Sequence, residues 1–232
     1  MSFQHNHSKA GIRHKQSIFL SVYSLLALNT NIYNIAMANL VPTYVPTAGD
    51  LLVINVGGVD TRTCGTLAGW TKITRNTTGN GTAILFYKIA DGSEVGATYT
   101  LTWAEGALRG GFAISVWNNV DTVNPLRDWA FTTAPVTGLS LTLPVQPTPI
   151  GVITLSDSQF ASNINNGSWL MNNGFENVGG MSAGASCYYK VAERRWRDGY
   201  GAATNVWFSS SVSHTVQGGW IAFNMARMPG MN

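Results

Sequence analysis

The residues that could carry out catalysis are few and scattered in this chain. Nucleophilic catalysis needs a base beside a serine hydroxyl or a cysteine thiol, and the only histidine after residue 40 is His214. Ser211 and Ser213 are its neighbours in sequence, but alternation along a strand does not assemble a catalytic triad. A histidine that packs in the core or faces solvent is the preferred interpretation. The sequence therefore predicts no catalytic residue and no enzyme.

The two cysteines give no stronger signal. Cys64 and Cys187 show no zinc-ligand spacing with His214. Two cysteines in a chain of 232 residues do not make a disulfide framework, and these two fall at unrelated places in the two sequence repeats described below. We therefore expect free thiols, no metal and no cofactor.

The eleven acidic residues are scattered along the chain. A glycosidase needs two carboxylates that face one cleft, and the sequence places no such pair. Asn118, Asn119, Asp121 and Asn124 offer the oxygen ligands of a calcium site, but a turn explains this cluster equally well. Five of the acids stand in expected turns, where Asp and Glu serve local hydrogen bonds: Asp60, Asp91, Glu94, Asp121 and Asp157.

Aromatic and arginine residues give the better lead. Five of the eight tryptophans fall on expected strands or at their ends and are assigned to the core: Trp70, Trp103, Trp117, Trp207 and Trp220. Trp129 in LRDWAF and Trp196 in ERRWRDGYG stand instead in expected polar loops beside arginines. Arg, Trp and Tyr dominate protein interfaces. We predict a partner-contact site, for protein more than for sugar, made of Arg127, Trp129, Arg194, Arg195, Trp196, Arg197 and Tyr200. A second interpretation stays open, in which the arginines cover Trp196 and pair with Asp198 within the chain.

The charge distribution excludes one class of partner. The formal net charge of +3 comes from Lys9, Arg13 and Lys15, because the first forty residues contain no Asp or Glu and the remaining residues balance 11 Lys and Arg against 11 Asp and Glu. A nucleic-acid groove needs many clustered cations. The neutral body therefore argues against nucleic-acid binding.

The elements that must position these residues read as β-strands. Only 11% of the residues are charged, 25 are glycine, and no long stretch with a helical period follows residue 40. Alternation and β-branched enrichment predict strands at 51–56, 70–74, 82–89, 98–103, 111–117, 139–143, 150–155, 182–191, 204–210 and 216–226. In 98–103, Tyr99, Leu101 and Trp103 are expected on one face and the three threonines on the other. The prediction is an all-β fold, an antiparallel β-sandwich with jelly-roll-like topology.

The body also repeats itself, which is a signal to be tested before any other. Three pairs of segments match: AILFYKIA (83–90) with ASCYYKVA (185–192), GGFAISVW (110–117) with GGWIAFNM (218–225), and LLVINV (51–56) with IGVITL (150–155). We expect two weakly similar halves, 48–120 and 148–226, that share one sandwich domain spanning 41–232. Lys88 and Lys190 are expected at equivalent strand positions.

Residues 1–40 are expected to form a separate arm, extended or partly helical. A basic polar segment precedes the apolar run 17–28, and Ala36-Met37-Ala38 resembles a signal-peptidase site. The run of about 12 residues is too short for a membrane span of about 20. Three interpretations stay open: an uncleaved anchoring arm, which is preferred, a cleaved secretory signal, and a misassigned start at Met37. The expected anchoring residues are Ile18, Phe19, Leu20, Tyr23, Leu25 and Leu26.

The run GDLLVINVGG, GWTKI, GTAILFYKIADG, ATYTLTW and GGFAISVWNNVDTVNP resembles a β-sandwich domain of bacteriophage virion proteins and some bacterial surface proteins. The resemblance covers nearly all of 48–226, counting the weaker second half. It is carried by core and turn residues, so it identifies a fold better than an activity. It implies a tail-fibre, appendage or capsid-decorating module, and it brings no catalytic residues.

These observations together predict a non-enzymatic virion protein, preferably a capsid cement protein. We expect a homo-oligomer, with a trimer favoured, bound to a major capsid or other virion protein, with no nucleic acid and no membrane in the mature form. Two alternatives are a tail-fibre or receptor-binding protein and a secreted or cell-surface carbohydrate-binding module with residues 1–38 removed. The latter would bind a glycan through Trp129 or Trp196.

Overall fold

The computed structural model describes residues 22–25, 32–37, 45–58, 60–74, 82–108, 110–118, 120–131, 139–143, 150–160, 170–171, 176–182, 187–196, 204–209, 215–224 and 226. The described strands are β1 (Val22–Leu25), β2 (Ile32–Ala36), β3 (Leu51–Gly58), β4 (Thr71–Thr74), β5 (Thr82–Ile89), β6 (Thr98–Thr102), β7 (Gly110–Trp117), β8 (Leu126–Phe131), β9 (Leu139–Leu143), β10 (Ile150–Phe160), β11 (Leu170–Met171), β12 (Glu176–Ser182), β13 (Cys187–Trp196), β14 (Thr204–Ser209) and β15 (Thr215–Asn224).

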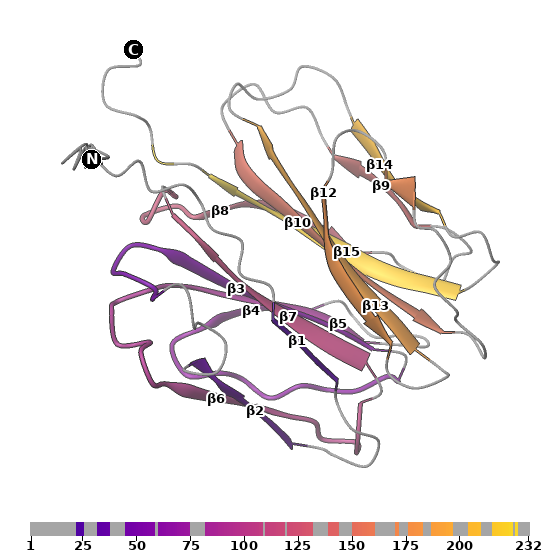
Figure 1. Ribbon diagram of the computed structural model, residues 1–232, viewed down its shortest axis with the longest axis horizontal. Coiled ribbons are helices and arrows are strands. Elements are labelled where there is room, and N and C mark those ends of the chain that lie inside the picture. The colour runs from indigo at the N-terminus through magenta and orange to yellow at the C-terminus, as the bar shows by residue number, and fades with distance from the viewer. Residues whose placement is uncertain are drawn as a thin grey trace, which may run out of the picture.

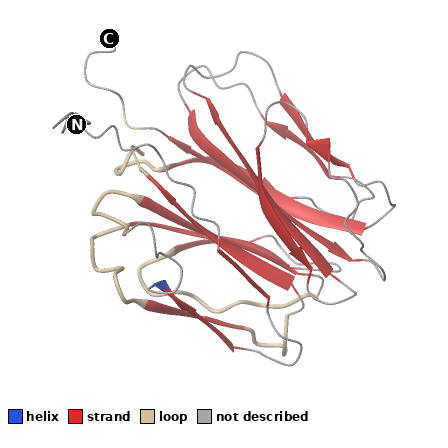
Figure 2. Ribbon diagram, viewed as in Figure 1, coloured by secondary structure: helices blue, strands red, loops and turns tan. Residues whose placement is uncertain are grey.

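The expectation of an all-β, antiparallel chain is confirmed. Every strand pair in the described residues is antiparallel. Within the same residues helical geometry is limited to Met37, the blue patch in Figure 2. The strands form two five-stranded sheets and two small ones. We call β1-β7-β3-β5-β4 the first sheet and β12-β13-β10-β15-β8 the second sheet.

The first sheet is buried on both faces. All eight residues of β3 are buried, which explains why LLVINVGG is a continuous apolar run rather than an alternating one. Leu52, Ile54 and Val56 pack in an apolar cluster with residues of β2 and β6. Leu51 and Val53, which alternate with them, pack on the opposite face with residues of β15. Each such side chain, when removed from water, contributes roughly 1.5–3 kcal/mol to folding.

The small sheet β2-β6 covers one face of the first sheet. Along β6, Leu101 is fully buried while Thr98, Thr100 and Thr102 are exposed, so the expected alternation is confirmed. On β2 the ring of Tyr33 lies 4.9 Å from that of Phe112 on β7, measured between centroids. β2 and β6 therefore cover this face of the first sheet as a two-stranded layer, whose exposed residues, among those described, are the three threonines, Asn34 and the half-exposed Ile32.

The second sheet lies against the other face of the first sheet. β3 contacts β10, β5 contacts β15, and β7 contacts β13. Ile221 and Phe223 of β15 are fully buried in the cluster that also contains Leu51 and Val53. Figure 1 shows the resulting order of layers, from β2-β6 through the first and second sheets to β9 and β14.

The two halves of the chain have the same strand order. The first sheet reads β1-β7-β3-β5-β4, and the second, taken from its other edge, reads β8-β15-β10-β13-β12. Each order is obtained from the other by matching β1 with β8, β3 with β10, β7 with β15, β5 with β13 and β4 with β12. The small sheets match as well. β6 pairs with β2, and Trp103, directly after β6, forms a bridge with Cys64, while β14 pairs with β9 and β11. We call β1–β7 the first half and β8–β15 the second half.

The repeat extends to residue register between β3 and β7. Val56 pairs with Phe112 in the first half, and Leu155 pairs with Trp220 in the second. The sequence repeat predicts the same pairs, if LLVINV is aligned with IGVITL and GGFAISVW with GGWIAFNM. The match holds for six consecutive pairs, from Gly58 with Gly110 to Val53 with Ser115.

The register of β5 and β13 differs between the halves. Lys88 pairs with Leu52, the second residue of β3, whereas Lys190 pairs with Asp157, the eighth residue of β10. The expectation that the two lysines are equivalent is therefore wrong. The first half turns after Ile89, where Asp91-Gly92 allows a tight turn, while β13 continues through Glu193–Trp196. Asp157, expected in a turn, lies inside β10, where it pairs with Lys190 on one side and with Gly218 on the other.

Several segments that the sequence did not mark as strands are strands. LRDWAF, expected to be a polar loop, is the whole of β8, and Trp196, also expected in a loop, is the last residue of β13. β8 pairs with β15 along its length, and this pairing, which is remote in sequence, overrides the polar composition. β11 and β12 were also not expected.

The stretch expected to form an arm contains two paired strands. β1 pairs with β7 and β2 pairs with β6. Tyr23 and Leu25 pair with Ala113 and Gly111 of the same chain. The other expected anchoring residues, Ile18, Phe19, Leu20 and Leu26, lie outside the described residues.

Candidate functional site

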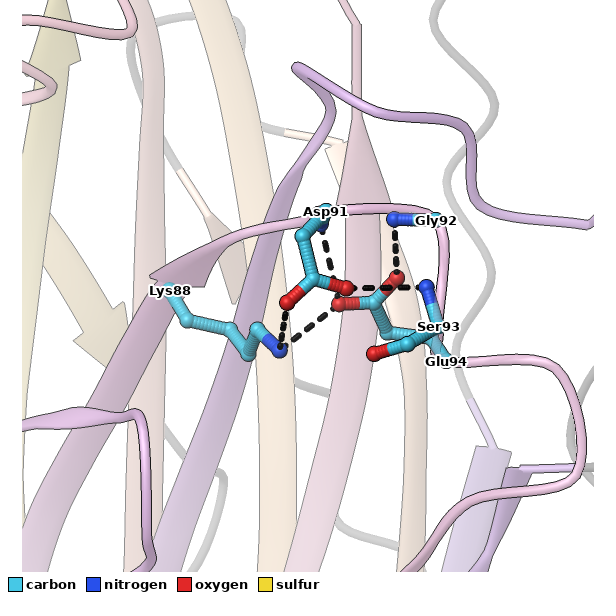
Figure 3. A network of polar contacts seen from close by, with 5 residues as sticks. All are labelled: Lys88, Asp91, Gly92, Ser93 and Glu94. Atoms are coloured by element: carbon cyan, nitrogen blue, oxygen red, sulfur yellow. Dashed lines mark hydrogen bonds and ion pairs between the residues drawn. The ribbon is translucent and has the colours of Figure 1, made fainter.

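A buried ion pair closes the turn after β5. The side chain of Glu94 is fully buried, and that of Lys88 is 12% exposed. Lys88 Nζ lies 2.7 Å from Glu94 Oε1 and 3.9 Å from Asp91 Oδ2. The backbone N–H groups of Asp91 and Gly92 donate to the Glu94 carboxylate at 3.2 and 3.0 Å, and that of Ser93 donates to Asp91 Oδ1 at 2.8 Å. Figure 3 shows these five residues as one network.

The electrostatics of this network keep both partners charged. Burial raises the pKa of Glu94, but the hydrogen bond from Lys88 and those from the backbone outweigh it and hold the pKa below its ordinary value. Burial likewise lowers the pKa of Lys88, and its hydrogen bond to Glu94 outweighs that effect and raises the pKa. A general acid or base at neutral pH needs a pKa near 7. The shifts run away from that value, so this pair is built to hold the turn.

Glycine makes the turn possible. Gly92 has φ of +94° and Gly96 has φ of +80°, a region that other L-residues rarely adopt. The ion pair then fixes the turn against the preceding strand, because Lys88 belongs to β5 and Glu94 to the turn itself. Asp91 and Glu94 thus serve local hydrogen bonds, as the sequence predicted.

A second polar cluster lies at Asn224, the last residue of β15. The backbone N–H of Asp121 donates to Asn224 O at 2.9 Å, and the Asn224 N–H donates to Pro125 O at 2.9 Å. Its side-chain amide donates to Asn124 O at 2.8 Å, and its Oδ1 accepts from Arg127 Nη1 at 3.2 Å. We call these the Asn224 contacts. They bind the linker between β7 and β8 to the end of the chain's last described strand.

The linker itself is the turn that was weighed against a calcium site. Asp121 Oδ1 accepts the backbone N–H groups of Val123 and Asn124, each at 2.9 Å. One carboxylate oxygen of the expected ligand set therefore serves the turn. The described residues contain no group of three or more His, Cys, Asp or Glu side chains that could hold a metal ion.

Trp129 is the expected contact residue that the structure exposes. It lies on β8, at the edge of the second sheet, and is 43% exposed. Its ring centroid lies 5.7 Å from that of Phe131. Its backbone N–H donates to Oδ1 of Asp128 at 2.8 Å, so a charged side chain caps a donor on the edge strand. Capping and charge are devices that discourage the addition of a further strand.

The expected contact residues of β13 reach the same end of the second sheet. Ile150 pairs with Asn224 on one side and with Trp196 on the other. The Trp196 backbone thus lies two strand spacings, about 10 Å, from the backbone of Asn224, and three spacings, about 14 Å, from β8, which carries Arg127. Arg194 pairs with Ile153 and precedes Arg195 on the strand. Arg197 and Tyr200 lie outside the described residues, as do Ser211, Ser213 and His214.

The tryptophans assigned to the core are found there where the structure describes their side chains. Trp117 is fully buried, Trp103 is 3% exposed and Trp70 is 9% exposed. Their indole N–H groups differ: that of Trp117 donates to Ser115 Oγ at 2.8 Å, while those of Trp70 and Trp103 are buried with no partner among the described residues.

Cys64 is a free, buried thiol. Burial raises its pKa to about 11, with Lys72 opposing the effect, so the thiolate that would react is scarce at neutral pH. The side chain of Cys187 lies outside the described part of the structure. Among the residues described, no helix is long and apolar enough to cross a membrane.

Sequence reasoning missed the Lys88–Glu94 pair as a unit. It assigned Glu94 to a turn but gave Lys88 no partner. The spacing was the available signal, because a lysine near the end of a strand and a glutamate six residues later, across Asp91-Gly92, can meet once the chain reverses. The role of Asn224 had no local signal, since its partners are about a hundred residues away.

Comparison of the chain with protein-family models, with curated proteins and with solved structures finds no match.

Proposed function

We propose that the protein is a non-enzymatic structural component of a bacteriophage virion and, more specifically, a capsid cement protein. On this proposal each half is a jelly-roll-like β-sandwich unit, in which a five-stranded sheet and a small sheet enclose one apolar cluster. The strand order β1-β7-β3-β5 opposite β2-β6 and the Cys64 bridge supports that topology.

One observation carries the structural role best. In the described part of the chain, the buried charged side chains hold the backbone in place. Glu94 closes the turn after β5. Asp50, which is 2% exposed, accepts hydrogen bonds from the backbone N–H and the hydroxyl of Thr47 at 2.8 and 2.9 Å. Charged groups used in this way stabilise one rigid shape. Rigidity without a poised titratable group suits a protein whose work is to fit a surface.

The proposed partner surface is the end of the second sheet that carries Arg127, Trp129 and Trp196. A half-exposed tryptophan beside arginine is the composition of an interface hot spot. We propose that this surface contacts a neighbouring subunit in a homotrimer or another virion protein. Residues 1–21 are proposed as the anchoring arm, since β1 and β2 already pair within the chain.

Two measurements test this proposal. Light scattering coupled to size-exclusion chromatography should give a mass about three times the 24.9 kDa of the chain. Antibodies raised against the purified protein should then label phage particles from the natural source in electron micrographs, at regular positions on the capsid. A stable monomer together with unlabelled capsids would refute the cement role, and label confined to tails would move the assignment to a tail fibre.

The exposure of Trp129 also supports one alternative, a carbohydrate-binding module. Exposed tryptophan rings are suited to stacking against sugar rings. A glycan array is the direct test, with Trp129→Ala as the matched variant. Binding that is lost in this variant favours the module, whereas loss of oligomerisation without any glycan binding favours the virion role.

A further inference from the structure

We propose that the chain is a fused dimer, in which the first and second halves are separate folding units that recognise each other through the inner faces of their five-stranded sheets. The inference concerns how the molecule is assembled and does not depend on the virion role. The partner of each half is the other half of the same chain. The inner face of each sheet fits the inner face of the other sheet and not a second copy of its own half.

The contacts between the sheets have the pattern of a twofold interface. A twofold axis would place each strand where its match in the other half lies. It would map the contact of β7 with β13 onto the contact of β15 with β5, and the contact of β3 with β10 onto itself. All three are present and are the most extensive contacts between the two sheets, whereas the contacts of β1 with β12 and of β13 with β3 have no counterpart of comparable extent among the described residues. In an isologous interface every contact occurs twice in this way, except those on the axis. The axis would therefore run between β3 and β10, at the centre of both sheets.

The side chains at matched positions have diverged in size. Ile221 and Phe223 of β15 are fully buried in the cluster between the sheets. The repeated register matches them with Ala113 and Ser115 of β7. Two first halves facing each other would lack the two large side chains, and two second halves would bring four of them together. Voids and overpacking are both unfavourable, so the halves fit each other better than themselves.

One aromatic contact shows how the large side chains are used. The ring of Phe223 meets that of Tyr87 on β5 of the first half in an edge-on arrangement, with centroids 6.0 Å apart. Trp117 and Leu85 of the first half lie in the same cluster. Phe223 of one half is therefore packed among apolar side chains of the other half, which is the role of a hot spot in an interface between proteins.

The linker offers the place to separate the halves. Val123 is 82% exposed at the tip of the turn between β7 and β8, whereas Val120 before it is buried. We would insert a recognition sequence for a site-specific protease at Val123 in the full chain, confirm that the uncut variant melts like the wild type, and cut it completely. The Asn224 contacts join Asp121 to Asn224 across the cut.

Native mass spectrometry of the cut protein is expected to show a 1:1 complex of the two fragments. Phe223→Ala should raise the dissociation constant of that complex about 100-fold or more. Phe112→Leu is the matched control, because Phe112 packs on the other face of the first sheet and its loss should leave the dissociation constant unchanged. Fragments that separate, that unfold on cutting, or that form homodimers as readily as the 1:1 complex would overturn the proposal.

A second measurement serves if the insertion prevents folding. In the intact chain without an inserted site, Phe223→Ala weakens the contact between two autonomous units. Calorimetry of this variant is therefore expected to resolve two unfolding transitions. A single transition that shifts as a whole would overturn the proposal, because it would mean that the sheets form one indivisible core.

Discussion

Replacing Glu94 by glutamine tests the account of the turn after β5 most sharply. The substitution keeps the size and shape of the side chain and removes its charge. Glu94 is fully buried and accepts hydrogen bonds from Lys88 and from two backbone N–H groups. Glutamine offers one acceptor oxygen in place of two and turns an NH₂ group toward a donor. Lys88 then keeps its charge at 12% exposure without an anion beside it.

Breaking a buried ion pair from one side costs about 3–5 kcal/mol. The lower end applies here because Lys88 retains some access to water and can rehydrate in part. We therefore expect Glu94→Gln to lower the free energy of unfolding by about 3 kcal/mol at pH 7, measured by urea titration with tryptophan fluorescence. The double variant Lys88→Met/Glu94→Gln should lose less than the sum of the single variants, since it leaves no lone charge.

The pH dependence follows from the lowered pKa of Glu94. A carboxyl group whose pKa is lower in the folded state contributes stability above its unfolded pKa, and that stability is lost as the pH falls through the folded value. Wild-type stability should therefore fall below about pH 4.5, and the fall should be shallower in Glu94→Gln. Glu105→Gln is the control, because Glu105 accepts the N–H of Thr63 from an exposed position and should change stability far less. A Glu94→Gln variant as stable as the wild type would refute this account.

Three further outcomes are expected. Cys64 should resist alkylation at pH 8 in the folded protein and react once urea unfolds it, as read by mass spectrometry of its peptide; rapid labelling of the native protein would contradict its burial. Deleting residues 1–38 removes β1 and β2 and should lower the melting temperature or prevent soluble expression, whereas an unchanged melting curve would show that these strands are dispensable. Asp128→Ala uncaps the Trp129 N–H on the edge strand and should increase concentration-dependent scattering, with Asp128→Asn, which keeps an acceptor oxygen, as the milder control.

Local pattern was sufficient for the strands whose neighbours are close in sequence or whose composition is strongly apolar. The bounds of β5 and β9 were predicted to the residue, and the alternation in β6 was predicted side chain by side chain. β8 was missed because LRDWAF has two charged residues side by side among its six and is stabilised by β15, about ninety residues later. β1 and β2 were missed because their apolar residues fit a signal or anchoring segment equally well before their partners, β7 and β6, were known.

The candidate site, too, was predicted from the sequence only in part. The turn at Asp91 and Gly92 was visible in the sequence, because these residue types favour tight turns. The Asn224 contacts were not, because a lone asparagine at the end of a strand carries no mark of its partners. The repeat was recognised from segments such as LLVINV and IGVITL, but similarity of letters did not fix the register of β13. There, four residues after Ala192 extend the strand and place Lys190 opposite Asp157.

The matching halves and the Asn224 contacts have a consequence for synthesis on the ribosome. Every strand of the first half has been made once residue 117 emerges, so separately folding halves, as proposed above, would let this half fold while the second half is still being translated. At 5–20 residues per second, the remaining hundred or so residues take roughly 5–20 s. During that interval Leu51, Val53 and Leu85 have no second sheet to cover them. The nascent chain therefore passes through a state with a wide apolar surface, and the arrival of β15, its last described strand, both covers that surface and fastens the linker.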